Sequence, residues 1–123
     1  MKLPLVVALS LLATSALAQQ AARDSDRMLD QVELMQLLSG QILEFYDDSQ
    51  SYYLQDGVYE YRYAPQDDPF VGTYTIADDS TVCVAFENGF DRCDLLVHDG
   101  NRYVLIVENG DRYPVRAISP AQL

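Results

Sequence analysis

Tryptophan is absent from the 123-residue chain, and histidine, lysine and cysteine are scarce, with one His, one Lys and two Cys. A single His excludes a metal site built from several imidazoles, and no Cys and His residues have the spacing of a zinc module. Repeated apolar runs long enough to cross a bilayer are also lacking, which excludes transporters. A length of 123 residues and an apolar fraction of 49% indicate one folded domain.

Residues 1–18 have the pattern of an export signal. Lys2 supplies the positive charge, residues 5–12 form a short apolar stretch, and Ala16 and Ala18 are the small residues of a cleavage site. The alternative interpretation of this segment is a permanent membrane anchor. The apolar stretch is short for a helix that must cross a bilayer, which disfavours that alternative. We therefore expect a signal peptide at 1–18, a flexible linker at 19–28, a single β-rich domain at 29–123, and a periplasmic or secreted protein without membrane insertion after cleavage.

The predicted mature chain is strongly acidic. It keeps seven Arg and no Lys against 19 acidic residues, a formal charge of −12. Such a surface repels phosphate backbones and anionic lipid headgroups, so we expect no nucleic-acid partner. The simpler explanation of this negative charge is that it keeps the protein soluble. The alternative explanation is a cationic partner. We expect a monomer and no cofactor.

One short helix is signalled between residues 30 and 40. Asp30 is a good N-cap, Glu33 completes a capping box, and Leu29 and Leu34 fit a hydrophobic staple. Gly40 suits the left-handed position that ends a helix. Further apolar residues, expected to be buried with Leu34, are Val32, Met35, Leu37 and Leu38.

From residue 40 onward the apolar period changes to two, and turn signals recur about every ten residues. The eight predicted strands cover residues 41–47, 51–54, 57–63, 71–77, 81–86, 90–97, 102–107 and 113–118. Their connections are short and join antiparallel neighbours. The fold class expected is mainly β: an antiparallel up-and-down meander that curls into a small barrel or half-barrel, with the helix at one open end. Any cavity inside such short strands is small.

Cys83 and Cys93 flank a predicted hairpin turn. With a two-residue turn at Asn88 and Gly89, Cys83 opposes Asp94, and the two sulfurs point to opposite faces. With a three-residue loop and Gly89 in the left-handed conformation, Cys83 opposes Cys93 directly. Export to an oxidising compartment favours the second register and a cross-strand disulfide. A redox-active pair is disfavoured because neither Cys begins a helix.

Two hairpins have nearly the same sequence, ENGFDR at residues 87–92 and ENGDR at 108–112. Duplicated recognition is one interpretation. Turn chemistry is the simpler one, because Asn and Gly accept a positive φ and the Arg then begins an outward face. This interpretation predicts that Arg92 and Arg112 each begin an outward face.

Candidate catalytic and metal-binding residues have simpler explanations. His98 precedes a turn, and no Ser lies in a G-x-S-x-G elbow, so a small hydrolase is the weakest alternative. Glu44 and Glu60 are a candidate acid and base of a glycosidase, yet each alternates with apolar neighbours as a solvent-facing residue does. Three carboxylate pairs could supply oxygen ligands to Ca²⁺, but each falls in a predicted turn. Asp is common in turns because its side chain hydrogen-bonds to the nearby backbone, so turn formation is the simpler explanation. These pairs are residues 47–48, 67–68 and 78–79.

Tyrosine is the most informative residue type in this chain. An apolar ring with a polar tip suits the lining of a small ligand pocket, a protein-binding surface or a barrel core. The residues that form this candidate ligand or partner surface are Tyr52, Tyr59, Tyr61, Tyr63, Tyr74, Tyr103 and Tyr113.

Several short motifs are shared with a known group of proteins. They are residues 37–40 (LLSG), 56–57 (DG), 72–74 (GTY), Cys83, Cys93 and 100–103 (GNRY). In this layout, over residues 29–118, the chain resembles small secreted alphaproteobacterial proteins of unknown function, the DUF995-like type. The resemblance implies export and a disulfide, and it brings no catalytic residues.

The sequence therefore predicts an exported, non-enzymatic binding or accessory protein with a Cys83–Cys93 disulfide. We expect its partner to be a small molecule, held in a Tyr-lined barrel, or a protein. The alternative is an inhibitor-like protein that presents its hairpins to a partner enzyme.

Overall fold

The computed structural model describes residues 22–122, so the predicted signal peptide lies outside the described residues. The predicted fold class is confirmed, with one short helix and a mainly antiparallel β domain. The elements are β1 (Arg27–Met28), α2 (Gln31–Leu38), β2 (Gln41–Phe45), β3 (Gln50–Tyr53), β4 (Val58–Arg62), β5 (Phe70–Ile76), β6 (Thr81–Phe86), β7 (Asp91–His98), β8 (Tyr103–Ile106) and β9 (Arg112–Pro120).

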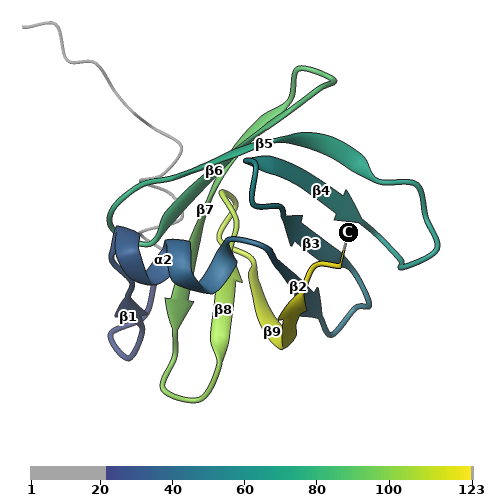
Figure 1. Cartoon of the computed structure of the whole chain (residues 1–123). Coiled ribbons are helices and arrows are strands. Elements are labelled where there is room, and N and C mark those ends of the chain that lie inside the picture. Colours follow the sequence, from purple (N-terminus) through teal and green to yellow (C-terminus); the bar gives the residue numbers. More distant parts are fainter. Residues whose placement is uncertain (1–21, 123) are drawn as a thin grey trace, which may run out of the picture.

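Strands β2 to β9 form a closed barrel rather than a half-barrel (Figure 1). Each strand pairs with its neighbour in sequence, from β2 through to β9. Strand β9 also pairs with β2, which closes the ring. Closure gives every strand two neighbours and so removes the exposed edges that an open meander leaves.

Strand β1 was not predicted from the sequence. Arg27 and Met28 pair with His98 and Val97 of β7, beside the part of β7 that β6 does not reach. The next residue, Leu29, is 1% exposed, and its amide donates a 2.5 Å hydrogen bond to the hydroxyl of Ser80. Residues 26–29, partly inside the predicted linker, are therefore held against the barrel.

Helix α2 begins and ends as the sequence predicts. The carboxylate of Asp30 accepts a 2.8 Å hydrogen bond from the amide of Glu33, and Gly40 has a φ of +75°. The Glu33 carboxylate itself binds Arg27 at 2.8 Å. The Asp30 carboxylate thus satisfies the Glu33 amide, but the predicted capping box is only half formed, because the Glu33 carboxylate binds Arg27 and not the Asp30 amide. The positive φ of Gly40 lets the chain turn directly into β2.

Only one narrow side of α2 is buried. Leu34 and Leu38, one helical turn apart, are fully buried in the barrel core, whereas Val32 and Met35 are 62% and 52% exposed. The expectation that Val32 and Met35 are buried is therefore wrong. The reason is that an eight-residue helix lying across a barrel end contacts it along one stripe of positions i and i+4.

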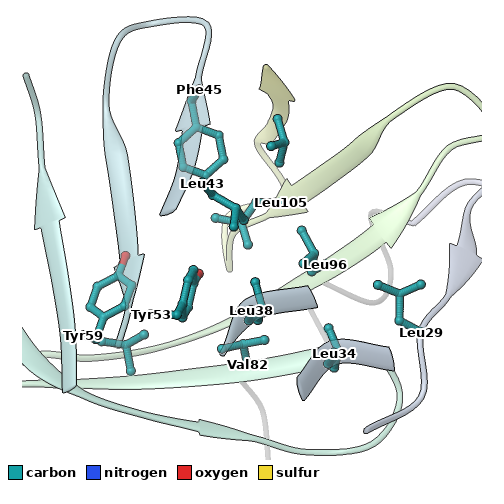
Figure 2. Packing of buried hydrophobic residues seen from close by; sticks show 12 residues of the cluster. Leu29, Leu34, Leu38, Leu43, Phe45, Tyr53, Tyr59, Val82, Leu96 and Leu105 are labelled. Carbon is teal, nitrogen blue, oxygen red and sulfur yellow. The ribbon is translucent and has the colours of Figure 1, made fainter. Parts of the chain in front are cut away.

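The core fills the barrel beneath α2. Figure 2 shows Leu34 and Leu38 gathered with Val82 and Leu96, and Tyr53 beside Tyr59. The rings of Tyr53 and Tyr59 lie 5.2 Å apart between centroids, and both side chains are buried. Tyrosine therefore occupies part of this interior in place of aliphatic residues.

A β-bulge changes the alternation in β9. Phe45 of β2 pairs with Val115, and Glu44 pairs with Ala117, so Arg116 is the extra residue. Val115 and Ile118 both contact the core although they are three residues apart. The bulge explains this spacing, because an extra residue resets which side chains face inward.

The predicted disulfide and its register are confirmed. Cys83 lies directly opposite Cys93, and the two are bonded. Gly89 has a φ of +89°, as the three-residue loop requires. The pair lies on the outer face of the barrel, because the flanking Val82 and Val84 point into the core.

A second apolar cluster lies on the same outer face. Four buried side chains from β7 and β8 form it, with Ala22 packed against them: Leu95, Val97, Val104 and Ile106. Next to this cluster Arg112 and Asp26 form a bidentate pair, with bonds of 2.7 and 2.9 Å, and the Asp26 side chain has no exposed surface. The segment 22–28 is thus fixed to the outside of the barrel at several points.

Candidate functional site

The two ends of the barrel differ. Helix α2 covers one end, and the β2–β3, β4–β5, β6–β7 and β8–β9 connections surround the other (Figure 1). At this second end the interior opens into a cavity of about 390 Å³. The residues that line it are Phe45, Ser49, Tyr61, Tyr63, Phe70, Phe86, Asn88, Phe90, Arg92, Leu105, Val107 and Tyr113. Seven of these twelve residues are aromatic.

The aromatic walls are held by ring-to-ring contacts. Tyr63 packs edge-on against Tyr61 at 5.0 Å and against Phe70 at 5.8 Å between ring centroids. Phe45 and Tyr113 contact each other in the same way at 6.4 Å. Edge-to-face pairs of this kind fix ring orientations, so the walls are largely formed before any ligand arrives.

Gly72 brings two of the rings together. It pairs with Tyr59 on one side and Phe86 on the other, and the Tyr59 and Phe86 rings lie 5.7 Å apart between centroids. A Cβ atom at Gly72 would lie 2.3 Å from the carbonyl oxygen of Ala85. Glycine is therefore required here for close backbone approach, and its missing side chain leaves room for the rings above it.

Arg92 is the only charged residue among those that line the cavity. Its side chain is 21% exposed, and its guanidinium carbon lies 5.8 Å from the centre of the Phe86 ring. The prediction that Arg92 begins an outward face is wrong. Phe86 pairs with Phe90 across the turn, so the even-numbered residues of β7 continue on the inner face.

Asp94 holds the guanidinium from the core side. The Arg92 Nε atom lies 2.9 Å from Asp94 Oδ1 and 3.0 Å from Oδ2, and the Asp94 side chain is 1% exposed. Nε donates its hydrogen bond to Oδ2, and Oδ1 accepts none within residues 22–122. Burial therefore raises the pKa of the Asp94 carboxyl to about 6, although the neighbouring Arg92 opposes the rise.

Two hydroxyl groups extend the polar network. The Tyr59 hydroxyl shares a 2.9 Å hydrogen bond with Ser51 and accepts a longer one, of 3.4 Å, from Arg92 Nη2. Burial raises the pKa of Tyr59 to about 12, so this side chain stays neutral and available for hydrogen bonding. The Tyr59 and Ser51 hydroxyl groups are thus paired at the inner end of the cavity, whereas Asp94 Oδ1 has no partner among residues 22–122.

The structure brings together some of the predicted tyrosines and separates the others. Tyr61, Tyr63 and Tyr113 line the cavity. Tyr59 lies directly beneath it in the core.

The remaining three predicted tyrosines lie elsewhere. Tyr74 donates to the Leu54 carbonyl oxygen at 2.7 Å, and Tyr103 packs against His98 at 4.9 Å between ring centroids. Tyr52 lies on the outer face of β3 beneath the guanidinium of Arg62. These three do not contribute to the cavity.

Arg92 and the phenylalanine residues of the cavity were not predicted from the sequence. Phe86 and Phe90 flank the predicted turn, where their alternation with Val84 and Arg92 signals a shared face. Phe45 and Phe70 end and begin strands that are distant in sequence. Only the closure of the barrel brings such residues to one opening.

The candidate catalytic and metal-binding residues do not assemble. His98 Nδ1 accepts a 3.1 Å hydrogen bond from the Gly100 amide. Glu44 pairs with Arg116 and Glu60 with Arg62, both away from the cavity lining. Across residues 22–122 no group of three or more His, Cys, Asp and Glu side chains is placed to hold a metal ion.

Comparisons with known proteins give no relative. No family model matches the chain, and neither curated proteins nor solved structures include a similar one. Among the described residues, no helix has the length and apolar character needed to cross a membrane.

Proposed function

We propose that this protein is an exported, non-enzymatic binding protein that holds a small, largely apolar ligand in the open end of its barrel. The observation that carries the proposal is the cavity of about 390 Å³ with seven aromatic residues in its lining. Its volume falls within the usual range of ligand pockets, roughly 300–1,000 Å³. Aromatic walls around a few polar groups are the ordinary composition of such pockets.

The proposed location outside the cytoplasm is supported by the Cys83–Cys93 bond, since disulfides persist in oxidising compartments. The pattern of residues 1–18 supports the same conclusion. We expect the mature protein to act in the periplasm or after secretion.

A protein partner is the second candidate function. Three aromatic side chains at the cavity opening are largely solvent-exposed: Phe90 at 60%, Tyr63 at 64% and Phe70 at 48%. Aromatic residues of this exposure are enriched at protein interfaces, as an inhibitor-like role for the hairpins requires.

Native mass spectrometry of protein purified from the periplasm tests the proposal. We expect a small molecule to be retained by the wild-type protein and by Val32→Trp, which adds a ring on the exposed side of α2. We expect Val107→Trp to lose it, because residue 107 lines the cavity and the larger ring fills it. Retention by both Trp variants contradicts binding in this cavity, and retention of a protein instead favours the second candidate.

A further inference from the structure

The inner end of the cavity presents unused hydrogen-bond donors. An arginine side chain has five N–H groups in a fixed planar arrangement. Nε of Arg92 is engaged by Asp94, and one N–H of Nη2 contacts Tyr59. Within residues 22–122, the two N–H groups of Nη1 and the second one of Nη2 have no hydrogen-bond acceptor.

The ion pair is oriented with its positive end toward the cavity. Phe90, Arg92, Asp94 and Leu96 follow one another down the inner face of β7, from the opening to the helix-covered end. Arg92 lines the cavity at 21% exposure, whereas Asp94 lies behind it at 1%. A ligand in the cavity therefore meets the guanidinium before the carboxylate.

Negative side chains are excluded from the same walls. The chain has 19 acidic residues, yet none lines the cavity. The polar side chains there are the Ser49 and Tyr hydroxyl groups and the Asn88 amide, which are neutral. Aromatic walls lower the local dielectric constant and strengthen charge-assisted hydrogen bonds from Arg92.

From this juxtaposition we propose that the cavity selects aromatic carboxylates, with the carboxylate bound by the terminal nitrogens of Arg92. The inference rests on the proposed function and adds the chemical class of the ligand. The planar guanidinium matches the two oxygens of a carboxylate. The rings of Phe86 and Tyr113 provide faces and edges for a flat ligand body of one or two rings.

Isothermal titration calorimetry at pH 8 with two probes of equal shape tests the proposal. The probes are 2-naphthoate and its neutral amide, 2-naphthamide. We expect the oxidised mature protein to bind the carboxylate at least tenfold more tightly than the amide. Equal affinities would overturn the charge selection and leave the proposed function standing, whereas failure of both probes to bind would contradict the proposed function for ligands of this size.

Variants assign the selection to Arg92. Arg92→Gln is expected to reduce the preference for the carboxylate over the amide to less than threefold. The double variant Arg92→Gln with Asp94→Asn is expected to show the same reduction, and in it no buried carboxylate is left without a counter-charge. Arg27→Gln is the matched control, because Arg27 lies at the helix-covered end and its side chain is 54% exposed. An undiminished preference in the folded double variant, or a loss in Arg27→Gln, would refute the role of Arg92.

Discussion

The hairpins at residues 86–90 and 107–111 have the same backbone and opposite consequences. In each, the amide of the first residue donates to the carbonyl oxygen of the last, at 2.8 and 3.1 Å. The third loop residue is glycine in both, Gly89 with a φ of +89° and Gly110 with a φ of +92°. The shared Glu-Asn-Gly sequence is therefore explained by the three-residue loop with a left-handed glycine.

One extra residue separates the two sequences. Phe90 follows the first glycine, so the Asp-Arg dipeptide begins one position later than it does after Gly110. Because side chains alternate across a strand, a shift of one residue reverses the face of each side chain that follows. Arg92 therefore points into the barrel, and Arg112 points outward to Asp26.

The two arginines affect their carboxylate partners in opposite ways. Hydrogen bonds from Arg112 hold the pKa of Asp26 below its ordinary value. Burial instead raises the pKa of Asp94 to about 6, despite the contact with Arg92. The same pair of residue types thus gives a stabilised ion pair on the outer face and a pair weakened by desolvation within the barrel.

Deleting Phe90 is the most severe test of this comparison. The deletion makes the two hairpins alike, moves Arg92 to the outer face and places Cys83 opposite Asp94. We expect the variant to be destabilised by more than about 4 kcal/mol, because the core face and the disulfide register change together. Thiol titration should find two free sulfhydryls in oxidised protein, and circular dichroism should show loss of cooperative melting. A bonded variant that melts like the wild type contradicts the register argument.

Replacing Arg92 by Met tests the inner pair alone. We expect a loss of about 3–5 kcal/mol in the free energy of unfolding at pH 8, because Asp94 is left buried without a counter-charge. Urea denaturation measures the loss. Adding Asp94→Leu should restore most of the stability, since an apolar pair replaces the ions. No recovery in that double variant would show that Arg92 stabilises by other contacts.

Replacing Arg112 by Met gives the corresponding measurement for the outer pair. We expect a smaller loss, about 1–2 kcal/mol, because Asp26 lies in a surface segment that can detach and hydrate its carboxylate. Urea denaturation measures this loss too. Trypsin should also cleave faster after Arg23 and Arg27 in this variant. An effect as large as that of Arg92→Met would remove the contrast between the two faces.

The inner pair also predicts a pH dependence of stability, through Asp94. Its pKa is about 6 in the folded state against 3.8 ordinarily, so the folded protein binds the proton more tightly than the unfolded chain. Stability from this group therefore increases as pH falls from 6 to 4, by roughly 2–3 kcal/mol. Urea denaturation of the wild type and Asp94→Asn between pH 4 and pH 6 isolates the contribution of Asp94 to the free energy of unfolding. Asp26 and Asp99 are present in both proteins, so their contributions cancel in the difference. A constant difference between the two proteins would show that Asp94 has an ordinary pKa.

Local patterns predicted most of the fold. The eight barrel strands follow from alternation and turn residues, and the position of Gly89 between Cys83 and Cys93 selected the correct register. Strand β1 was missed because two residues, Arg27 and Met28, carry no periodic pattern.

The site was less predictable, because face assignments in short strands depend on single residues. Strand β3 places Tyr52 outside and Tyr53 inside, and nothing in Gln-Ser-Tyr-Tyr distinguishes them. The repeated Glu-Asn-Gly turn predicts an outward Arg after each hairpin, but Phe90 shifts the alternation by one residue before Arg92. The aromatic character of the cavity was predicted through Tyr61, Tyr63 and Tyr113, whereas its charge was not.

The pairing of β1 with β7 has a consequence for how far the amino-terminal segment can be trimmed by proteases. Arg27 and Met28 cover backbone groups of Val97 and His98 where β6 has already ended. Removal of residues 22–28 would leave that stretch of β7 as an unpaired edge next to apolar Leu95 and Val97. A truncated chain would then be prone to self-association through strand addition, so this short segment protects the barrel against aggregation.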